Sequence, residues 1–192
     1  MTKNIFKLVF APSSGRRNKA IFLDRDGVIN KKPNKHKYVT KWSEFTFNPG
    51  VIELVRVANE KGYLVIITTN QRGIARGLMK LDDFKQLTIS MVKEFRKAKA
   101  VINAVYYCPH DYSDQCICRK PKDGLMKEAI KDFGINPETS IALGDSVKDI
   151  EAAQLSRIGN IIKIHSDRTA KLTFNQFFKK GTPIRDRMVC RE

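Results

Sequence analysis

Hydrophobic positions along the chain alternate between short apolar runs and amphipathic stretches with helical spacing. The apolar runs predict strands at residues 20–23, 64–69, 101–107, 139–143 and 160–164. The amphipathic stretches, with apolar residues three or four positions apart, predict helices at residues 51–61, 84–95, 125–133 and 147–155. Strands that alternate with helices in this way predict a doubly wound α/β fold, in which helices cover both faces of a mostly parallel sheet. Ligands of such folds bind at the carboxyl ends of the strands.

The composition adds a strong basic excess to this picture. The 192 residues include 36 Lys and Arg against 20 Asp and Glu, which gives a formal net charge of +16. The excess is concentrated near both ends and in residues 30–41. We therefore expect a basic N-terminal extension at 1–18, one folded domain at 19–165 and a basic C-terminal tail at 166–192. A positive charge of this size favours anionic partners, either nucleic acids or phosphorylated small molecules.

The same sequence argues against several classes of protein. A hydrophobic content of 42% is too high for general disorder, and no apolar run approaches the roughly 18 residues of a membrane span. The apolar run at 5–10 is short and is interrupted by Lys7, so it makes a poor signal peptide. Four cysteines are too few for a disulfide scaffold of this length. We expect a cytoplasmic protein with no membrane partner.

Two aspartates directly follow the first predicted strand. Asp24 and Asp26 are two residues apart, so their side chains point to the same side of an extended chain, and Gly27 permits a tight turn. Carboxylates this close repel each other, and a divalent cation or a shared proton relieves the repulsion. Taken alone, an Asp-rich turn can also simply end a strand.

Three further polar clusters lie at residues 69–72, 119–120 and 145–149. The hydroxyl and amides of the first cluster suit a phosphoryl oxygen, and the two cations of the second can neutralise a phosphate. The third cluster places two acids four residues apart, where both can face the same way. Each cluster alone has an ordinary explanation, in helix capping, a solvated turn or the helix dipole. All of them together, in an alternating α/β chain, indicate a site for phosphoryl transfer.

With these motifs in place, residues 19–165 resemble the haloacid dehalogenase superfamily of phosphohydrolases. The resemblance implies that Asp24 is a nucleophile that forms an aspartyl-phosphate and that Asp26 is the general acid and base. It implies that Thr69 and Lys120 hold the transferring phosphoryl oxygens. It also implies a catalytic Mg²⁺ with the ligands Asp24, Asp26 (through its backbone carbonyl) and Asp145, supported by Asp149.

A second cluster consists of cysteines and a histidine. Three thiolates and one imidazole within eleven residues form a closed tetrahedral ligand set for Zn²⁺, and such a set leaves no position for water. We therefore predict a structural zinc site in the loop at 108–118, which delivers Arg119 and Lys120; the alternative is a set of buried thiols beside an exposed histidine. Cys190 stands apart from this set. The predicted zinc ligands are Cys108, His110, Cys116 and Cys118.

Within the superfamily, the zinc loop resembles two subgroups, the heptose bisphosphate phosphatases and the histidinol-phosphate phosphatases. Residues 69–71 and 73–77 are more similar to the heptose enzymes. This sequence differs from the heptose enzymes at Arg72, where a small residue is usual, and at Ser146, where a lysine is common. The contacts to substrate that it implies are Arg25, Lys35, Tyr38, Asn70, Gln71, Arg72 and Arg119.

Several functions remain open on the sequence. The first is a phosphatase that removes one phosphate from a sugar bisphosphate of lipopolysaccharide heptose synthesis. The five lysines in residues 31–41 would attract this doubly phosphorylated substrate. The others are a histidinol-phosphate phosphatase, a phosphatase of nucleic-acid 3′ ends, favoured by the net charge, and a binding module without activity. Only 44 residues separate Asp24 from Thr69, too few for a cap domain, so we expect an open site. The resemblance suggests a monomer.

Overall fold

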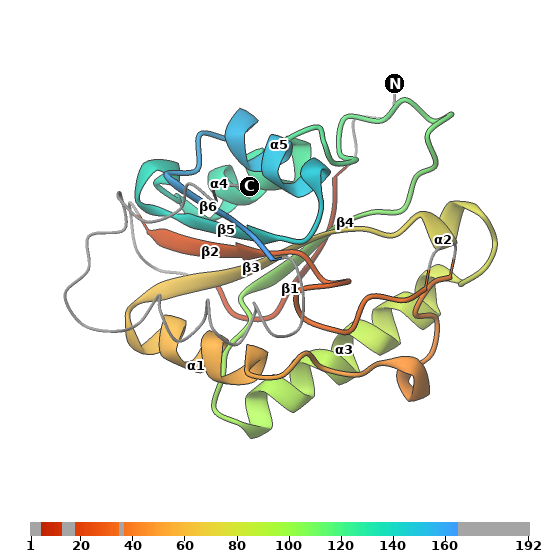
Figure 1. The fold of residues 1–192 in the computed structure, drawn as a ribbon, viewed down its shortest axis with the longest axis horizontal. Coiled ribbons are helices and arrows are strands. Elements are labelled where there is room, and N and C mark those ends of the chain that lie inside the picture. Colours follow the sequence, from red (N-terminus) through yellow and green to blue (C-terminus); the bar gives the residue numbers. More distant parts are fainter. Residues whose placement is uncertain (1–4, 13–17, 35–36, 165–192) are drawn as a thin grey trace, which may run out of the picture.

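A six-stranded sheet forms the centre of the computed structural model, which describes residues 5–12, 18–34 and 37–164. The strand order is β1-β4-β3-β2-β5-β6, and every pair is parallel except β1 with β4 (Figure 1). The central strands β3, β2 and β5 therefore end side by side. The strands are β1 (Phe6–Val9), β2 (Lys19–Leu23), β3 (Tyr63–Asn70), β4 (Ala104–Cys108), β5 (Ile141–Gly144) and β6 (Asn160–Lys163).

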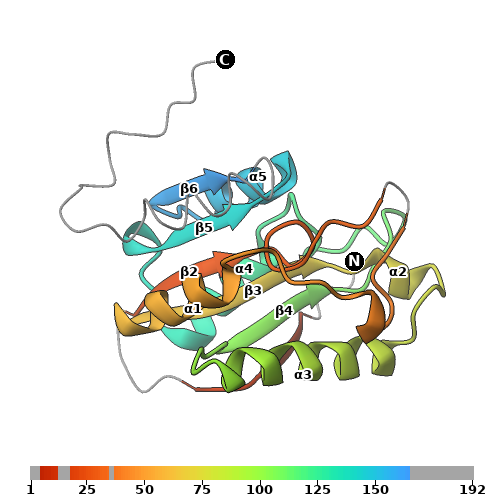
Figure 2. The same ribbon diagram turned by 60° about the horizontal axis from the view of Figure 1, so that its bottom comes forward.

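Helices cover both faces of this sheet, which confirms the predicted fold class. Figures 1 and 2 show α1 and α3 on one face and α4 and α5 on the other. The helices are α1 (Val51–Glu60), α2 (Arg72–Ala75), α3 (Leu81–Lys97), α4 (Gly124–Phe133) and α5 (Val147–Leu155), with short 3₁₀ helices η1 (Trp42–Glu44) and η2 (Pro137–Thr139). Within the described residues, no helix is both long enough and apolar enough to cross a membrane.

The alternation of side chains along β2 divides the core into two layers. Ile21 and Leu23 pack with the apolar residues of α1 and α3, whereas Ala20 and Phe22 pack with those of α4 and α5. Each helix buries residues three or four positions apart, as the spacing predicted. A fully buried aliphatic or aromatic side chain contributes about 1.5–3 kcal/mol, so both layers hold the strand ends firmly in place.

Two predicted strands begin later than the hydrophobic pattern indicated. The strand predicted at 101–107 begins at Ala104, because the side chain of Asn103 accepts a hydrogen bond from the backbone of Val65 and donates one to that of Ala11. The strand predicted at 139–143 begins at Ile141, because Pro137 starts a 3₁₀ helix just before it.

The edge strand β1 was not predicted, and it lies inside the segment assigned to the N-terminal extension. It pairs with β4 and is fixed by a lysine that points across to α4. Lys7 Nζ donates to Asp132 Oδ2 at 2.5 Å, and the hydroxyl of Tyr106 donates to the same oxygen at 2.5 Å. Part of the N-terminal segment therefore belongs to the sheet.

Candidate active site

The carboxyl ends of the central strands bring the predicted catalytic residues to one edge of the sheet. Asp24 follows β2, Thr69 lies near the end of β3 and Asp145 follows β5. The backbone N–H of Asp24 donates to the carbonyl oxygen of Leu143 at 3.1 Å, which continues the pairing of β2 with β5 up to the aspartate. Asp24 and Asp145, which are 121 positions apart in the sequence, are thus neighbours, as expected at the ends of parallel strands.

Lys120 is the central cation of this site. Its Nζ lies 2.7 Å from Asp24 Oδ1, 2.5 Å from Asp149 Oδ1 and 2.7 Å from the carbonyl oxygen of Thr68. These three acceptors use all three donors of the ammonium group. Burial acts to lower the pKa of Lys120, but the charges of Asp24 and Asp149 outweigh it and raise the pKa, so the lysine is charged.

Three aspartates of this site, Asp24, Asp145 and Asp149, face only two lysines, Lys120 and Lys32. Burial raises the pKa of Asp24 to about 7, against the lowering effect of Lys120. Burial also raises the pKa of Asp145. For Asp149, burial acts in the same direction, but the charge of Lys120 outweighs it and lowers the pKa.

The same carboxylates fit a divalent cation. Asp24, Asp145 and Asp149 each place one carboxylate oxygen within 4.8 Å of the others. An octahedral Mg²⁺ with bonds of about 2.1 Å keeps its ligand oxygens within about 4.2 Å of one another, so a small inward movement would bring these carboxylates to one ion. Asp149 also accepts hydrogen bonds from the backbone and hydroxyl of Ser146, at 3.0 and 2.6 Å, which agrees with a supporting position. The Asp26 carboxylate is not part of this group.

Gly27 is required for the close approach of Asp145. Its backbone has a φ of 104°, in the left-handed region, and a Cβ added there would lie 2.2 Å from Asp145 Oδ2. Any other residue would push this carboxylate out of the site.

Asp26 is held by a ring of hydrogen-bond donors. Arg25 Nη2 lies 2.8 and 2.9 Å from its two oxygens, and the side-chain amides of Asn30 and Gln71 donate to it at 3.0 and 3.1 Å. The side chain of Arg25 is only 1% exposed. Arg25, which the sequence analysis placed among the substrate contacts, is therefore positioned to act through Asp26.

The Thr-Asn-Gln turn after β3 is engaged mainly within the protein. Thr69 is buried, and its hydroxyl accepts a hydrogen bond from Gln71 Nε2 at 2.8 Å. Asn70 pairs with the backbone of Lys120, donating to its carbonyl and accepting from its N–H, both at 3.0 Å. The two amides thus fix Thr69 and Lys120.

The lysine-rich loop at 31–41 reaches the site through one residue that the sequence analysis did not single out as a contact. Lys32 Nζ lies 2.6 Å from Asp145 Oδ2, although the lysine side chain is 61% exposed. Tyr38 packs its ring against Gly73 at the start of α2, where an added Cβ would lie 3.2 Å from the ring. Lys35 lies outside the described residues.

The predicted zinc ligands converge on one point. Cys108 Sγ lies 3.6 Å from Cys116 Sγ, which lies 3.5 Å from Cys118 Sγ. His110 Nδ1 lies 3.7 Å from Cys108 Sγ and 3.2 Å from Cys118 Sγ. Sulfur ligands in a tetrahedral site with Zn–S bonds of about 2.3 Å are about 3.8 Å apart, so the cluster fits zinc.

A group of charged residues surrounds Tyr112 next to the zinc ligands. The cationic groups of Arg72, Arg119 and Lys148 lie 4.5, 4.4 and 5.2 Å from the centre of the Tyr112 ring. Arg72 Nε also donates to Asp111 Oδ1 at 2.6 Å. We call these five residues the Tyr112 cluster. The sequence analysis included the two arginines but not Tyr112 or Lys148, because only the folded loop brings them together.

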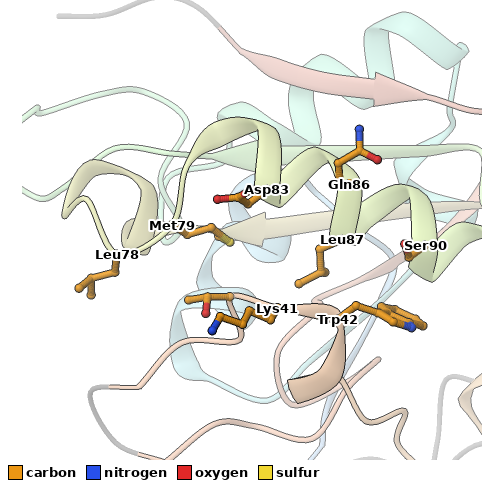
Figure 3. A pocket seen from close by; sticks show the side chains of 9 residues that line it. Lys41, Trp42, Leu78, Met79, Asp83, Gln86, Leu87 and Ser90 are labelled. Atoms are coloured by element: carbon orange, nitrogen blue, oxygen red, sulfur yellow. The ribbon is translucent and has the colours of Figure 1, made fainter.

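A separate pocket of about 350 Å³ lies between the lysine-rich loop and α3 (Figure 3). Trp42 and Lys41 line one side, and Leu78 and Met79 line the other. The pocket is lined neither by Asp24, Asp26, Asp145, Asp149 or Lys120 nor by any residue of the Tyr112 cluster, so it is distinct from the candidate active site.

Comparisons with known proteins agree with this geometry. Residues 19–176 match the family model described as polynucleotide kinase 3 phosphatase. The D-glycero-alpha-D-manno-heptose-1,7-bisphosphate 7-phosphatase of Campylobacter jejuni is 42% identical over 161 residues, which cover 84% of this chain and 91% of that protein. The D-glycero-beta-D-manno-heptose-1,7-bisphosphate 7-phosphatase of Haemophilus influenzae is 39% identical over 173 residues, which cover 87% and 85%.

A solved structure is also similar to this chain. It is the D,D-heptose 1,7-bisphosphate phosphatase from B. bronchiseptica, complexed with magnesium and phosphate. The two chains are 25% identical, with a TM-score of 0.69, and the match covers 82% of this chain and 99% of the other. The resemblance in sequence thus extends to the fold.

Proposed function

Because the chain belongs to the polynucleotide kinase 3 phosphatase family of the haloacid dehalogenase superfamily, and is therefore a phosphatase, we propose that it removes one phosphate from a sugar bisphosphate. The first candidate is D-glycero-D-manno-heptose 1,7-bisphosphate, with loss of the 7-phosphate. The observation that carries this proposal is the identity of about 40% with two heptose bisphosphate phosphatases over most of the chain. These relatives act on different anomers, so both anomers are candidates.

The reaction begins with attack on the phosphate by Asp24. Its carboxylate oxygen forms a bond to phosphorus while the bond from phosphorus to the sugar oxygen breaks, which gives an aspartyl-phosphate. Asp26 donates a proton to the departing sugar oxygen and then accepts one from the water that attacks the intermediate. The donors around Asp26, above all Arg25, hold its carboxyl in one orientation for both steps.

Charge around the transferred group is balanced by residues that are already in place. The Lys120 ammonium contacts Asp24, and the Thr69 hydroxyl, which accepts from Gln71, keeps its own proton to donate. Both can donate to oxygens of the transferring phosphoryl group once Lys120 exchanges one of its protein acceptors for a phosphoryl oxygen. Asp24, Asp145 and the backbone carbonyl of Asp26 would hold magnesium, which would supply positive charge beside the carboxylates and the phosphate. Lys32 would compete with the ion, because both are cations that approach the Asp145 carboxylate.

A structural zinc ion completes the proposal. Three cysteines and His110 would hold it, and four protein ligands leave no open coordination position. Its function is to fix the loop at 108–118, which leads directly into Arg119 and Lys120.

The architecture leaves the site open, which admits either a sugar phosphate or the end of a nucleic acid. In the described residues between β2 and β3, the chain forms only a loop, η1 and α1, so no cap domain covers the site there. Removal of 3′ phosphates from nucleic acids is the second candidate, because the matching family model carries that description and the net charge is +16.

Steady-state kinetics with magnesium test the proposal. The panel contains both anomers of the heptose 1,7-bisphosphate, histidinol phosphate and a single-stranded oligonucleotide with a 3′ phosphate. We expect the highest kcat/KM with one heptose bisphosphate. A higher kcat/KM with the oligonucleotide, falling steeply as the salt concentration rises, would show that the substrate is a nucleic acid and not a sugar bisphosphate. A higher kcat/KM with histidinol phosphate would also contradict the proposed sugar bisphosphate substrate.

A further inference from the structure

The edge strand β1 contacts the zinc loop, although it lies ahead of the residues that the family model matches. That match begins at residue 19, whereas β1 spans Phe6–Val9. β1 pairs antiparallel with β4 in a register that places Phe6 opposite Tyr107. The next residue of β4 is Cys108, the first of the proposed zinc ligands. A strand outside the matched region is therefore attached to the strand that leads into the metal cluster.

His110 is the most exposed of the four proposed zinc ligands. The three cysteines are at most 2% exposed, whereas His110 is half-buried. The torsion that rotates an imidazole ring has broad energy wells, so the neighbours of the ring decide where its nitrogens point. His110 Nδ1 lies 3.2 Å from Cys118 Sγ, and a rotated ring would carry this nitrogen away from the sulfurs. The orientation of the imidazole thus depends on what packs against it.

Phe6 packs against this imidazole. The centres of the two rings are 5.6 Å apart and their planes are inclined by 68°, which is an edge-to-face contact. Such a contact favours one arrangement of the two rings, because the positive edge of one ring faces the negative face of the other. The phenyl ring of β1 therefore limits the rotation of the ligand that burial constrains least.

Phe6 is itself held from two directions. The centre of its ring lies 5.7 Å from that of Tyr107, which in turn lies 4.6 Å from that of Phe84 on α3. The adjacent residue, Lys7, forms an ion pair of 2.5 Å with Asp132 on α4. Successive side chains of a strand point to opposite faces of the sheet, so β1 is attached to a helix on each face (Figure 2). Phe6 thus has a fixed position from which to orient His110.

From these contacts we propose that Phe6 is a positioning residue of the zinc site. It holds the His110 imidazole with Nδ1 toward the cysteines, and β1 thereby slows the release of zinc. The inference rests on the zinc site of the proposed function. Loss of a partner that orients a metal ligand costs about 10–100-fold in metal affinity, and a ring contact without a hydrogen bond belongs at the lower end of this range.

The competing explanation is that Phe6 only adds apolar burial to β1. Its ring packs with Tyr107 and Phe84, so its removal could loosen β1 and, with it, the whole zinc loop. In that case, the loss of Phe6 would speed zinc release whether or not His110 is present. If Phe6 acts through His110, its loss has no further effect once the imidazole is gone. A double-mutant cycle separates the two explanations.

The test follows the transfer of zinc from the full, zinc-loaded chain to an excess of a chromogenic chelator. We expect F6A to release zinc about tenfold faster than the wild type, and H110A at least as fast as F6A. The double variant F6A/H110A should release zinc at the same rate as H110A. The control V9A shortens an exposed side chain of the same strand and should keep the wild-type rate. The conservative variant F6Y retains the ring and should also keep that rate.

Substitution of zinc by cobalt(II) gives a second measurement that does not depend on activity. The visible absorption bands of cobalt(II) depend on the type and geometry of its ligands. The spectrum of cobalt-loaded F6A should therefore shift toward that of H110A, whereas the spectrum of V9A should match the wild type. An F6A spectrum identical to that of the wild type would contradict an action of Phe6 through His110.

The outcomes separate a failure of this inference from a failure of the zinc site. If the wild type retains no zinc, the proposed zinc site is wrong. If the wild type retains zinc and F6A releases it at the same rate, the role of Phe6 is wrong. The role is also wrong if F6A speeds release by the same factor in the H110A background. Thermal unfolding shows whether F6A is folded, and F6V, which keeps a strand-forming residue with a shorter side chain, repeats the comparison if it is not.

Discussion

Lys32 pairs with Asp145, one of the carboxylates proposed to hold the metal. The lysine comes from an exposed loop, and its Nζ lies 2.6 Å from the carboxylate oxygen Oδ2. The charge and hydrogen bond of Asp145 raise the pKa of Lys32, so the lysine stays protonated and occupies this carboxylate. It therefore neutralises Asp145 and would compete with a metal ion for this carboxylate.

The variant Lys32→Gln should bind Mg²⁺ more tightly than the wild type. An exposed ion pair contributes roughly 0.2–1 kcal/mol, so the gain in affinity is at most about fivefold. Titration calorimetry on the metal-free protein, with no substrate present, measures this directly. The variant Lys37→Gln removes an exposed charge from the same loop and serves as the control. Weaker magnesium binding by Lys32→Gln would show that Lys32 assists the metal rather than competing with it.

Arg25 and Lys120 show what the residue pattern can and cannot predict. The position of Lys120 beside Asp24 followed from the motif order, and the structure places its Nζ 2.7 Å from Asp24 Oδ1. The sequence analysis placed Arg25 among the substrate contacts and did not predict that its side chain is 1% exposed and holds Asp26. Burial of a charged residue depends on what packs over it, here Phe84, 5.9 Å away, and that contact is distant in sequence.

The zinc loop joins the metal cluster to the cations of the site. Lys120 lies two residues after Cys118, and its backbone is paired with Asn70. The position of the Lys120 ammonium therefore depends on how the loop is fixed. Because of this coupling, we expect the proposed zinc ion to affect activity although it would have no open coordination position.

The variant Cys116→Ser should lose zinc and most of its activity while keeping the folded sheet. Elemental analysis should find close to one zinc per chain in the wild type, retained when magnesium is removed, and much less in the variant. Loss of one ligand from a tetrahedral site strongly weakens metal binding, because the remaining ligands no longer fill the coordination shell of the metal. A variant without zinc but with full activity and stability would show that the cysteines are buried thiols and not a functional metal site.

The edge strand β1 escaped the sequence analysis for a physical reason. It spans only Phe6–Val9, every second residue is half-exposed, and Lys7 interrupts the apolar run. Such a pattern is too short to separate from a loop. Its place is decided by contacts that are distant in the chain, namely the ladder with β4 and the ion pair of Lys7 with Asp132.

The variant Asp132→Asn should therefore destabilise the protein at neutral pH. Burial acts to raise the pKa of Asp132, but hydrogen bonds from Lys7 and Tyr106 outweigh it and hold the pKa below its usual value. A lowered pKa in the folded state stabilises the protein above about pH 4, and this contribution disappears as the pH falls through the lowered value. Urea unfolding should show a loss of about 1–2 kcal/mol at pH 7 that shrinks below pH 4. A constant difference at all pH values would contradict this explanation.

On the scale of the whole molecule, the sequence predicted the fold more completely than the arrangement of residues at the mouth of the site. Parallel strands end at one edge whatever the loops do, so Asp24, Thr69 and Asp145 were predictable as neighbours. The Tyr112 cluster depends instead on the path of the zinc loop between its ligands. Lys35, which the sequence analysis placed among the substrate contacts, and much of the basic excess at the two ends lie outside the described residues.

The central claim is that Asp24 carries the phosphoryl group during turnover, and trapping this intermediate tests it most directly. The variant Asp26→Asn, with a chromogenic phosphate ester as substrate, should form the aspartyl-phosphate but release it slowly, because no base activates the water. Acid quenching and reduction with borohydride should then convert residue 24 to homoserine, which peptide mass spectrometry identifies. We predict this product at position 24 in Asp26→Asn and none in Asp24→Asn, which should also lose turnover. Normal steady-state turnover in Asp24→Asn, or homoserine at another aspartate, would contradict the account.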